Sequence, residues 1–94
     1  MSQLQEVTIT AQNTFTGPIQ APYDHDIAVS ISGTFGATVT PQRSLDNGIT
    51  WADLDTTYTA PAEFNIVSTA GCIYRVGVKT GDFTSGTVSV KVRA

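Results

Sequence analysis

The feature that most constrains the fold is a short turn sequence in the middle of the chain, SLDNGITW at residues 44–51. Asn47 and Gly48 tolerate a positive φ angle at little cost, and a tight hairpin turn requires that conformation. The carboxylate of Asp46 can accept hydrogen bonds from backbone N–H groups of the turn. We therefore expect a β-hairpin at this point, which commits the flanking residues to strands.

The residues beside this turn extend the hairpin. Ser44 and Thr50 lie just outside it and are expected to face each other as a cross-strand pair. Gly48 is part of the turn, and Trp51 is large enough to anchor the hairpin on a core. The stretch fits the pattern S-x-D-x-G-x-T-W, which resembles the Asp-box hairpin of sialidases and other β proteins. In such proteins the motif is structural, and a sialidase would need several boxes and an arginine cluster. This protein has one box and three arginines, which are Arg43, Arg75 and Arg93.

Composition limits the class of protein. Ninety-four residues allow a single domain, 1–94, with one core. Thr, Ser, Val and Gly are abundant while Leu, Lys and Glu are scarce, and this favours strands over helices. The net charge is −3 and there is no basic run, so we expect no nucleic-acid partner. Charged residues make up only 14% of the sequence, which suits a surface partly covered by a partner or by copies of the protein.

Cysteine use and hydropathy bear on the compartment. Cys72 is the single cysteine, so no intrachain disulfide can form. Residues 1–6 lack the charged and apolar regions of a signal peptide, and no stretch approaches 18 apolar residues. We expect a protein made in a reducing cytoplasm without a membrane partner, with residues 1–5 as a flexible N-terminal arm.

Alternation of polar and apolar residues predicts an all-β protein. Glycine and proline mark a long irregular connection at 14–26, a corner at 33–36 and a turn at 81–82. No helical period is present. The predicted strands number about seven and lie near 7–11, 27–31, 39–45, 49–54, 63–67, 72–79 and 86–93.

This pattern indicates an antiparallel β-sandwich. The run Tyr74-Arg75-Val76-Gly77-Val78 resembles the Y-x-V-x-V strand of fibronectin type III-like and other immunoglobulin-like domains. The resemblance implies an immunoglobulin-like fold of the branch without a disulfide. A jelly roll or a small barrel is the competing architecture, because strand count alone does not separate these folds.

Candidate chemical sites are few. Asp24-His25-Asp26 is the only grouping with metal-ligand chemistry, as a calcium loop or simply as a solvated turn. Cys72 begins a strand on its inward face and is interpreted as a buried structural residue. A nucleophile at Cys72 or at a serine would need His25, the only histidine, as its base. We therefore expect no catalytic residues, no metal and no cofactor.

Aromatic residues in or beside loops are candidates for partner contact. Tyr23, Phe35 and Tyr58 belong to this group, together with Phe15. Exposed together, they could form a sugar-binding platform or a protein contact. The alternative is that they plug the open ends of a small sandwich, since a core of this size needs large side chains.

The segment 39–91 resembles small proteins encoded among the head and tail genes of tailed bacteriophages. The shared features are an Asp-Gly turn followed by Thr50-Trp51, the corner Tyr58-Thr59-Ala60-Pro61, and the hairpin that runs from Tyr74-Arg75-Val76-Gly77-Val78-Lys79-Thr80-Gly81-Asp82-Phe83 to Thr84-Ser85-Gly86-Thr87-Val88. The first 36 residues lack this resemblance. Because these motifs are turns and strands, they point to a family rather than to a role.

The resemblance implies a virion structural protein, assembled in the bacterial host cytoplasm and without catalysis. Its concrete form is a capsid decoration or cement protein that binds the major capsid protein as a homotrimer, through sandwich loops and the N-terminal arm. Two alternatives stay open. One is an immunoglobulin-like module of a tail or fibre that binds carbohydrate or a receptor, and the other is a head–tail joining protein.

Overall fold

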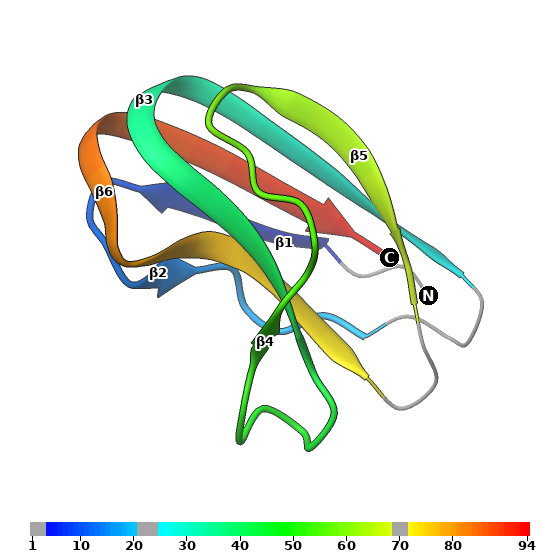
Figure 1. Ribbon diagram of the computed structural model, residues 1–94. Coiled ribbons are helices and arrows are strands. Elements are labelled where there is room, and N and C mark those ends of the chain that lie inside the picture. Colours follow the sequence, from blue (N-terminus) through cyan, green and yellow to red (C-terminus); the bar gives the residue numbers. More distant parts are fainter. Residues whose placement is uncertain (1–3, 21–24, 69–71) are drawn as a thin grey trace.

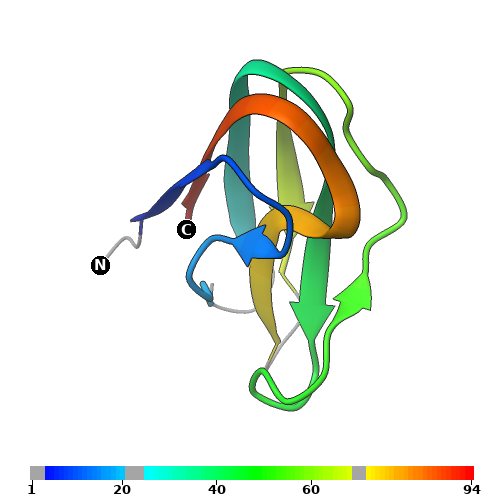
Figure 2. The same cartoon turned by 90° about the vertical axis from the view of Figure 1, so that its left-hand side faces the viewer.

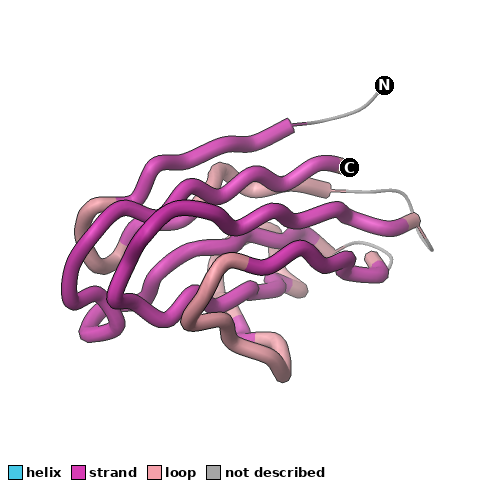
Figure 3. The backbone as a smooth tube through the Cα atoms, turned by 90° about the horizontal axis from the view of Figure 1, so that it is seen from above, coloured by secondary structure: helices cyan, strands magenta, loops and turns pink. Residues whose placement is uncertain are grey.

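The computed structural model describes residues 4–20, 25–68 and 72–94, which form strands joined by loops (Figures 1 and 3). The expected all-β antiparallel fold is confirmed, because every strand pairing in the described residues is antiparallel. No described segment forms a helix long and apolar enough to cross a membrane. The strands are β1 Leu4–Ile9, β2 Thr14–Phe15, β3 Asp26–Ser44, β4 Ala52–Asp53, β5 Ala62–Val67 and β6 Ile73–Arg93.

Two long strands, β3 and β6, form the backbone of the fold. They pair with each other from Ala28↔Arg93 to Ser44↔Ile73 and bend together near the middle, so that one sheet folds over into two layers (Figures 1 and 2). In the first layer, β1 and β5 flank the halves of β6 and β3 that lie on one side of the bend. In the second layer, β2 and β4 flank the other halves. The result is a β-sandwich-like fold.

Glycine permits the close approach of backbones at the bend. Gly33 and Gly86 have φ angles of 108° and 90°, which side chains other than that of glycine rarely allow. A Cβ atom at Gly33 would lie 2.3 Å from the carbonyl oxygen of Thr87, and one at Gly86 would lie 2.3 Å from that of Thr34. The register of the β3–β6 pair also shifts between Gly36 and Val39. The two strands thus bend sharply while their pairing resumes on the far side.

The strand predictions need correction at these bends. The corner at 33–36 and the turn at 81–82 were expected to separate strands, whereas both lie inside the continuous strands β3 and β6. Each long strand replaces two predicted ones, which reduces seven strands to five, and β2 is a sixth strand inside the connection 14–26 that was expected to be irregular. The strand predicted near 49–54 is reduced to β4. Leu4 and Gln5 pair with Arg93 and Val92 in β6, so they are not part of a flexible arm, and residues 1–3 lie outside the described residues.

The order of the segments matches the jelly-roll alternative. In an immunoglobulin domain the last two strands lie in the same sheet, whereas here residues 73–78 and 88–93 lie in different layers. When β3 and β6 are divided at the bend, the paired segments in sequence order are 4–9, 14–19, 26–31, 39–44, 52–58, 62–67, 73–78 and 88–93. The first segment lies beside the eighth, the second beside the seventh, the third beside the sixth and the fourth beside the fifth. This wrapped ribbon is the arrangement of a jelly roll. The described pairings leave the sheet open, so it is not a barrel.

The core lies between the two layers and consists mainly of β-branched side chains. Along β6, alternate residues point inward as predicted, with Val76, Val78, Val88, Val90 and Val92 fully buried. The prediction that Cys72 is buried is also confirmed. The buried hydrophobic residues are Ile9, Ile19, Ile27, Val29, Ile31, Val39, Ile66, Cys72, Tyr74, Val76, Val78, Val88, Val90 and Val92.

Candidate functional site

The loop between β3 and β4, residues 45–51, is held together by the Asp46 carboxylate. Asp46 Oδ1 accepts hydrogen bonds from the Ser44 hydroxyl at 2.8 Å and the Thr50 backbone N–H at 2.9 Å. Its Oδ2 accepts one from the Thr50 hydroxyl at 2.6 Å. Ser44 Oγ in turn accepts from the backbone N–H of Gly48 at 2.7 Å. The predicted role of Asp46 as acceptor for the turn is therefore confirmed.

The pairing expected across the predicted hairpin is not found. Ser44 and Thr50 do not form a cross-strand pair, because Ser44 lies opposite Ile73 of β6 and Thr50 precedes β4. The Asp46 side chain joins them instead. Asn47 and Gly48 adopt positive φ angles of 59° and 92°, as the turn sequence predicts. The hairpin is thus a wider loop organised by one side chain.

The hydrogen bonds to Asp46 stabilise its ionised form. The bonds from Thr50 and Ser44 lower the pKa of Asp46 to about 2. The loop therefore keeps its charged acceptor throughout the neutral and mildly acidic range. Its conformation is fixed by hydrogen bonds to side chains rather than by burial.

This fixed loop presents two aliphatic side chains to solvent. Leu45 is 71% exposed and Ile49 is 82% exposed. They lie on either side of the Asp46–Gly48 turn, whose backbone the hydrogen bonds hold in place. Scattered apolar residues are common on protein surfaces, but here two of them share one rigid loop.

Trp51 connects this loop to the outer face of the second layer. The guanidinium carbon of Arg75 lies 4.3 Å from the centre of the Trp51 ring and 3.9 Å from the centre of the Phe15 ring. Such contacts are favourable cation–π interactions. Trp51 is half-buried and packs on Arg75, so it does not anchor the hairpin on the core as expected.

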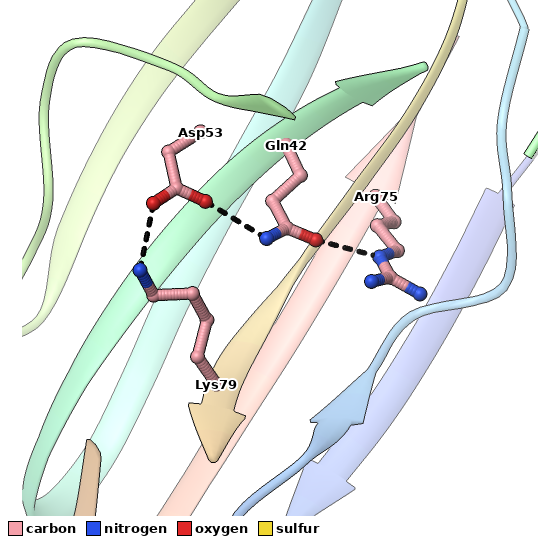
Figure 4. A network of polar contacts seen from close by, with 4 residues as sticks. All are labelled: Gln42, Asp53, Arg75 and Lys79. Carbon is pink, nitrogen blue, oxygen red and sulfur yellow. Dashed lines mark hydrogen bonds and ion pairs between the residues drawn. The ribbon is translucent and has the colours of Figure 1, made fainter. Parts of the chain in front are cut away.

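A network of polar contacts fixes the orientation of Arg75 (Figure 4). Arg75 Nε donates to Gln42 Oε1 at 2.8 Å, and Gln42 Nε2 donates to Asp53 Oδ1 at 2.8 Å. Asp53 Oδ2 forms an ion pair with Lys79 Nζ at 2.7 Å. The hydrogen bond from Lys79 is the main cause that lowers the pKa of Asp53, and the same bond raises the pKa of Lys79. Both groups are therefore charged at neutral pH.

A shallow hollow of about 370 Å³ opens beside this network. Gln42 and Arg75 of the network line it, and Phe15 contributes an aromatic ring. Burial lowers the pKa of Arg75, although an arginine remains protonated at neutral pH. The lining residues are Asn13, Phe15, Gln42, Arg75, Lys79 and Thr80.

The alternation of residues along β6 already indicated that Arg75 and Lys79 share the outer face of the second layer, but neither was predicted as a site residue. Because Tyr74, Val76 and Val78 point inward, Arg75 and Lys79 must point outward from the same strand. Phe15 lies opposite Gly77, whose missing side chain leaves room for the β2 backbone. Only the pairing of β2 with β6 brings Phe15 to Arg75, and that pairing cannot be read from either segment alone.

The aromatic residues predicted as partner contacts are distributed differently. Phe35 lies at the bend of β3 and Tyr58 lies beside Val39, and both pack against the core. Tyr58 also stacks on Phe64, with ring centres 4.2 Å apart. Phe35 and Tyr58 are thus half-buried, while Tyr23 lies outside the described residues, so the partner contact expected of these three residues stays a prediction.

The remaining predicted groups lie elsewhere. Asp24 lies outside the described residues, so the 24–26 loop can be described only in part. The His25 carbonyl accepts a hydrogen bond from the Ser68 backbone N–H at 3.0 Å, which ties this segment to the end of β5. Within residues 4–20, 25–68 and 72–94, no group of three or more His, Cys, Asp and Glu side chains could hold a metal ion.

Comparison of this protein with models of protein families, with curated proteins and with solved structures gave no match.

Proposed function

We propose that this protein is a structural protein of a tailed-phage particle, where it decorates the capsid by binding the major capsid protein. The observation that carries the proposal is the rigid loop 45–51 with Leu45 and Ile49 exposed at 71% and 82%. Burial of these two aliphatic side chains against another protein would remove apolar surface from water, which favours association.

The energetics of binding favour such a loop. An interface loses affinity when a flexible segment must be ordered, and prior ordering removes that cost. Hydrogen bonds to Asp46 and Ser44 already hold loop 45–51 in one conformation. Trp51 is the last residue of the loop and Arg75 packs on it, and tryptophan and arginine are enriched among the residues that dominate binding energy. Loop 45–51 and the outer face around Arg75 together have the properties of a protein-binding surface.

The architecture supports the same proposal. Jelly-roll sandwiches are common in viral capsid proteins, and the order of the paired segments matches that arrangement. The resemblance of residues 39–91 to proteins of phage head and tail gene clusters points in the same direction. We further propose that the protein assembles as a homotrimer on the capsid, which native mass spectrometry of the purified protein would test.

Sedimentation with assembled capsids tests the proposed function. Wild-type protein should pellet with capsids built from the major capsid protein of the same phage, and the double variant Leu45→Ser/Ile49→Ser should remain in the supernatant. Val67→Ser is the matched control, because Val67 is also an exposed aliphatic residue, at 61%, but lies in β5. Wild-type protein that stays in the supernatant, and is absent from purified virions by mass spectrometry, would refute the proposal.

A second candidate is a carbohydrate-binding or receptor-binding module of a tail or fibre. The observation that favours it is the aromatic and polar hollow beside Phe15 and Arg75, on an architecture that lectins also use. A glycan array with wild-type protein and Trp51→Ala tests this candidate. Binding that is specific for one class of glycan and lost in the variant would favour it over capsid decoration.

A further inference from the structure

The side chain of Arg75 is more strongly oriented than its position on an outer face requires. Its guanidinium carbon lies 3.9 Å from the centre of the Phe15 ring and 4.3 Å from the centre of the Trp51 ring. Gln42, only 6% exposed, accepts the hydrogen bond from Nε. Asp53 holds the Gln42 amide in the orientation that presents its oxygen to Arg75. Four side chains thus determine where this guanidinium points.

This arrangement leaves the outer edge of the guanidinium unused. Gln42 engages only Nε of Arg75 (Figure 4), and neither terminal nitrogen has a hydrogen-bond partner in the described part of the protein. Asp53, the carboxylate of the same network, is engaged through both oxygens, one with Gln42 and one with Lys79. Arg75 therefore lacks an ion-pair partner among residues 4–20, 25–68 and 72–94.

The charge and geometry of this edge define what it can bind. A guanidinium presents parallel N–H donors that match the two oxygens of a carboxylate. A guanidinium is also more weakly hydrated than an ammonium group, which reduces the cost of bringing an anion to it. Lys79 is already neutralised by Asp53, so Arg75 supplies the unpaired positive charge of the hollow.

We propose that Arg75 is the binding site for a carboxylate of the partner protein, which is an Asp or Glu side chain or the carboxylate at its C-terminus. This inference rests on the proposed function and specifies its chemistry. A protein partner is favoured over an acidic sugar because the site continues through Trp51 into the loop that exposes Leu45 and Ile49. A protein can occupy both the apolar tip and the charged hollow, whereas a sugar acid has no use for the aliphatic pair.

Titration by NMR tests the site directly. The probes are N-acetyl-glutamate N-methylamide, its neutral glutamine analogue and glucuronate, added to 15N-labelled protein. The readouts are the Nε–H resonance of Arg75 and the indole N–H of Trp51, which is the only tryptophan. We expect the glutamate probe to shift both resonances saturably and to bind roughly tenfold more tightly than the glutamine probe.

Two variants complete the test. Arg75→Lys keeps the positive charge but loses the parallel N–H donors of the guanidinium, and it should weaken binding of the glutamate probe roughly tenfold. Arg93→Lys makes the same change in the first layer and should leave binding unchanged. Equal binding of the two amino-acid probes to the wild-type protein would overturn the inference without reliance on any variant. Tighter binding of glucuronate than of the glutamate probe would overturn it in favour of an acidic glycan.

Capsid sedimentation separates this inference from the proposed function. If Arg75→Lys pellets with capsids as well as wild-type protein does, while Leu45→Ser/Ile49→Ser does not pellet, then the carboxylate site is wrong and capsid binding stands. If wild-type protein does not pellet at all, the proposed function fails first.

Discussion

β3 changes direction once within its length and once at its end, and the two changes are built differently. At the bend, Gly33 lies so close to the backbone of Thr87 that even a Cβ atom would collide with it. At loop 45–51, the backbone is held by hydrogen bonds that its N–H groups donate to the side chains of Asp46 and Ser44. The bend therefore depends on a residue without a side chain, whereas the loop depends on the side chains of Asp46 and Ser44.

The bend determines the architecture of the fold, whereas the loop forms the proposed binding surface. The bend folds one sheet into two layers, so a change there affects the whole core. The loop lies at one end of the second layer and exposes Leu45 and Ile49, so a change there affects the surface. A protein that binds a partner through the loop can therefore vary its tip without loss of the fold.

The largest effect is expected from a side chain at the bend. Gly86→Val should lower the free energy of unfolding by at least about 3 kcal/mol, because it combines a positive φ angle with collision against the Thr34 carbonyl. Gly81→Ala is the matched control, since Gly81 has a φ angle of 89° but open space around its Cβ position. Gly81→Ala should lower the free energy of unfolding by only about 1 kcal/mol. Equal losses for the two variants in urea unfolding would show that close backbone approach is not what shapes the bend.

A smaller and more local effect is expected in the loop. Asp46→Asn removes a charged acceptor that serves both the backbone and the hydroxyl of Thr50. We expect faster hydrogen exchange at the loop amides and a lower Tm, by less than in Gly86→Val, while exchange in the core stays slow. Asp55→Asn, an exposed substitution in the β4–β5 connection, is the control. Loss of protection in β6 as well as in the loop would contradict the separation of the two regions.

The same carboxylate predicts a dependence of stability on pH. The folded-state pKa of Asp46 is about 2, below the ordinary value of about 3.9. Its contribution to stability is therefore complete above pH 4 and is lost as the pH falls from about 4 to about 2. Thermal unfolding of wild-type protein and Asp46→Asn at several pH values should show a Tm difference that shrinks over this interval. A constant difference would mean that Asp46 titrates normally in the folded protein.

The smallest effect on stability is expected at the loop tip. Leu45→Ser/Ile49→Ser should change the free energy of unfolding by no more than about 0.5 kcal/mol per residue, because both side chains are largely exposed. Equilibrium unfolding in urea measures this. A large loss would show that the aliphatic pair stabilises the fold, and would weaken its assignment as a binding surface.

Local sequence was sufficient to predict the turn within the loop, but not the width of the loop or the position of Trp51. Asp46 as acceptor and the positive φ angles of Asn47 and Gly48 followed from residue chemistry within a few positions. The inward residues of β6, such as Val88 and Val90, followed from strict alternation. These features depend on neighbours in the sequence, which is why one sequence reveals them.

The layer order and the Arg75 face depend instead on residues far apart in the sequence. The glycines at 33–36 and 81–82 were expected to separate strands, since glycine marks both turns and sharp bends. Their pairing across the sheet decides which of the two occurs. Phe15 contacts Arg75 only because β2 pairs with β6, and this pairing cannot be predicted from the sequence of either strand alone. The choice between immunoglobulin-like and jelly-roll order rests on the same long-range pairings.

The most direct test of the central claim is hydroxyl-radical footprinting of the wild-type protein, free and bound to capsids. Leu45, Ile49 and Trp51 should be strongly modified in the free protein and protected in the complex, while Val67 in β5 should react equally in both. Unchanged reactivity of Leu45 and Ile49 on capsids that demonstrably carry the protein would contradict the assignment of this loop as the contact.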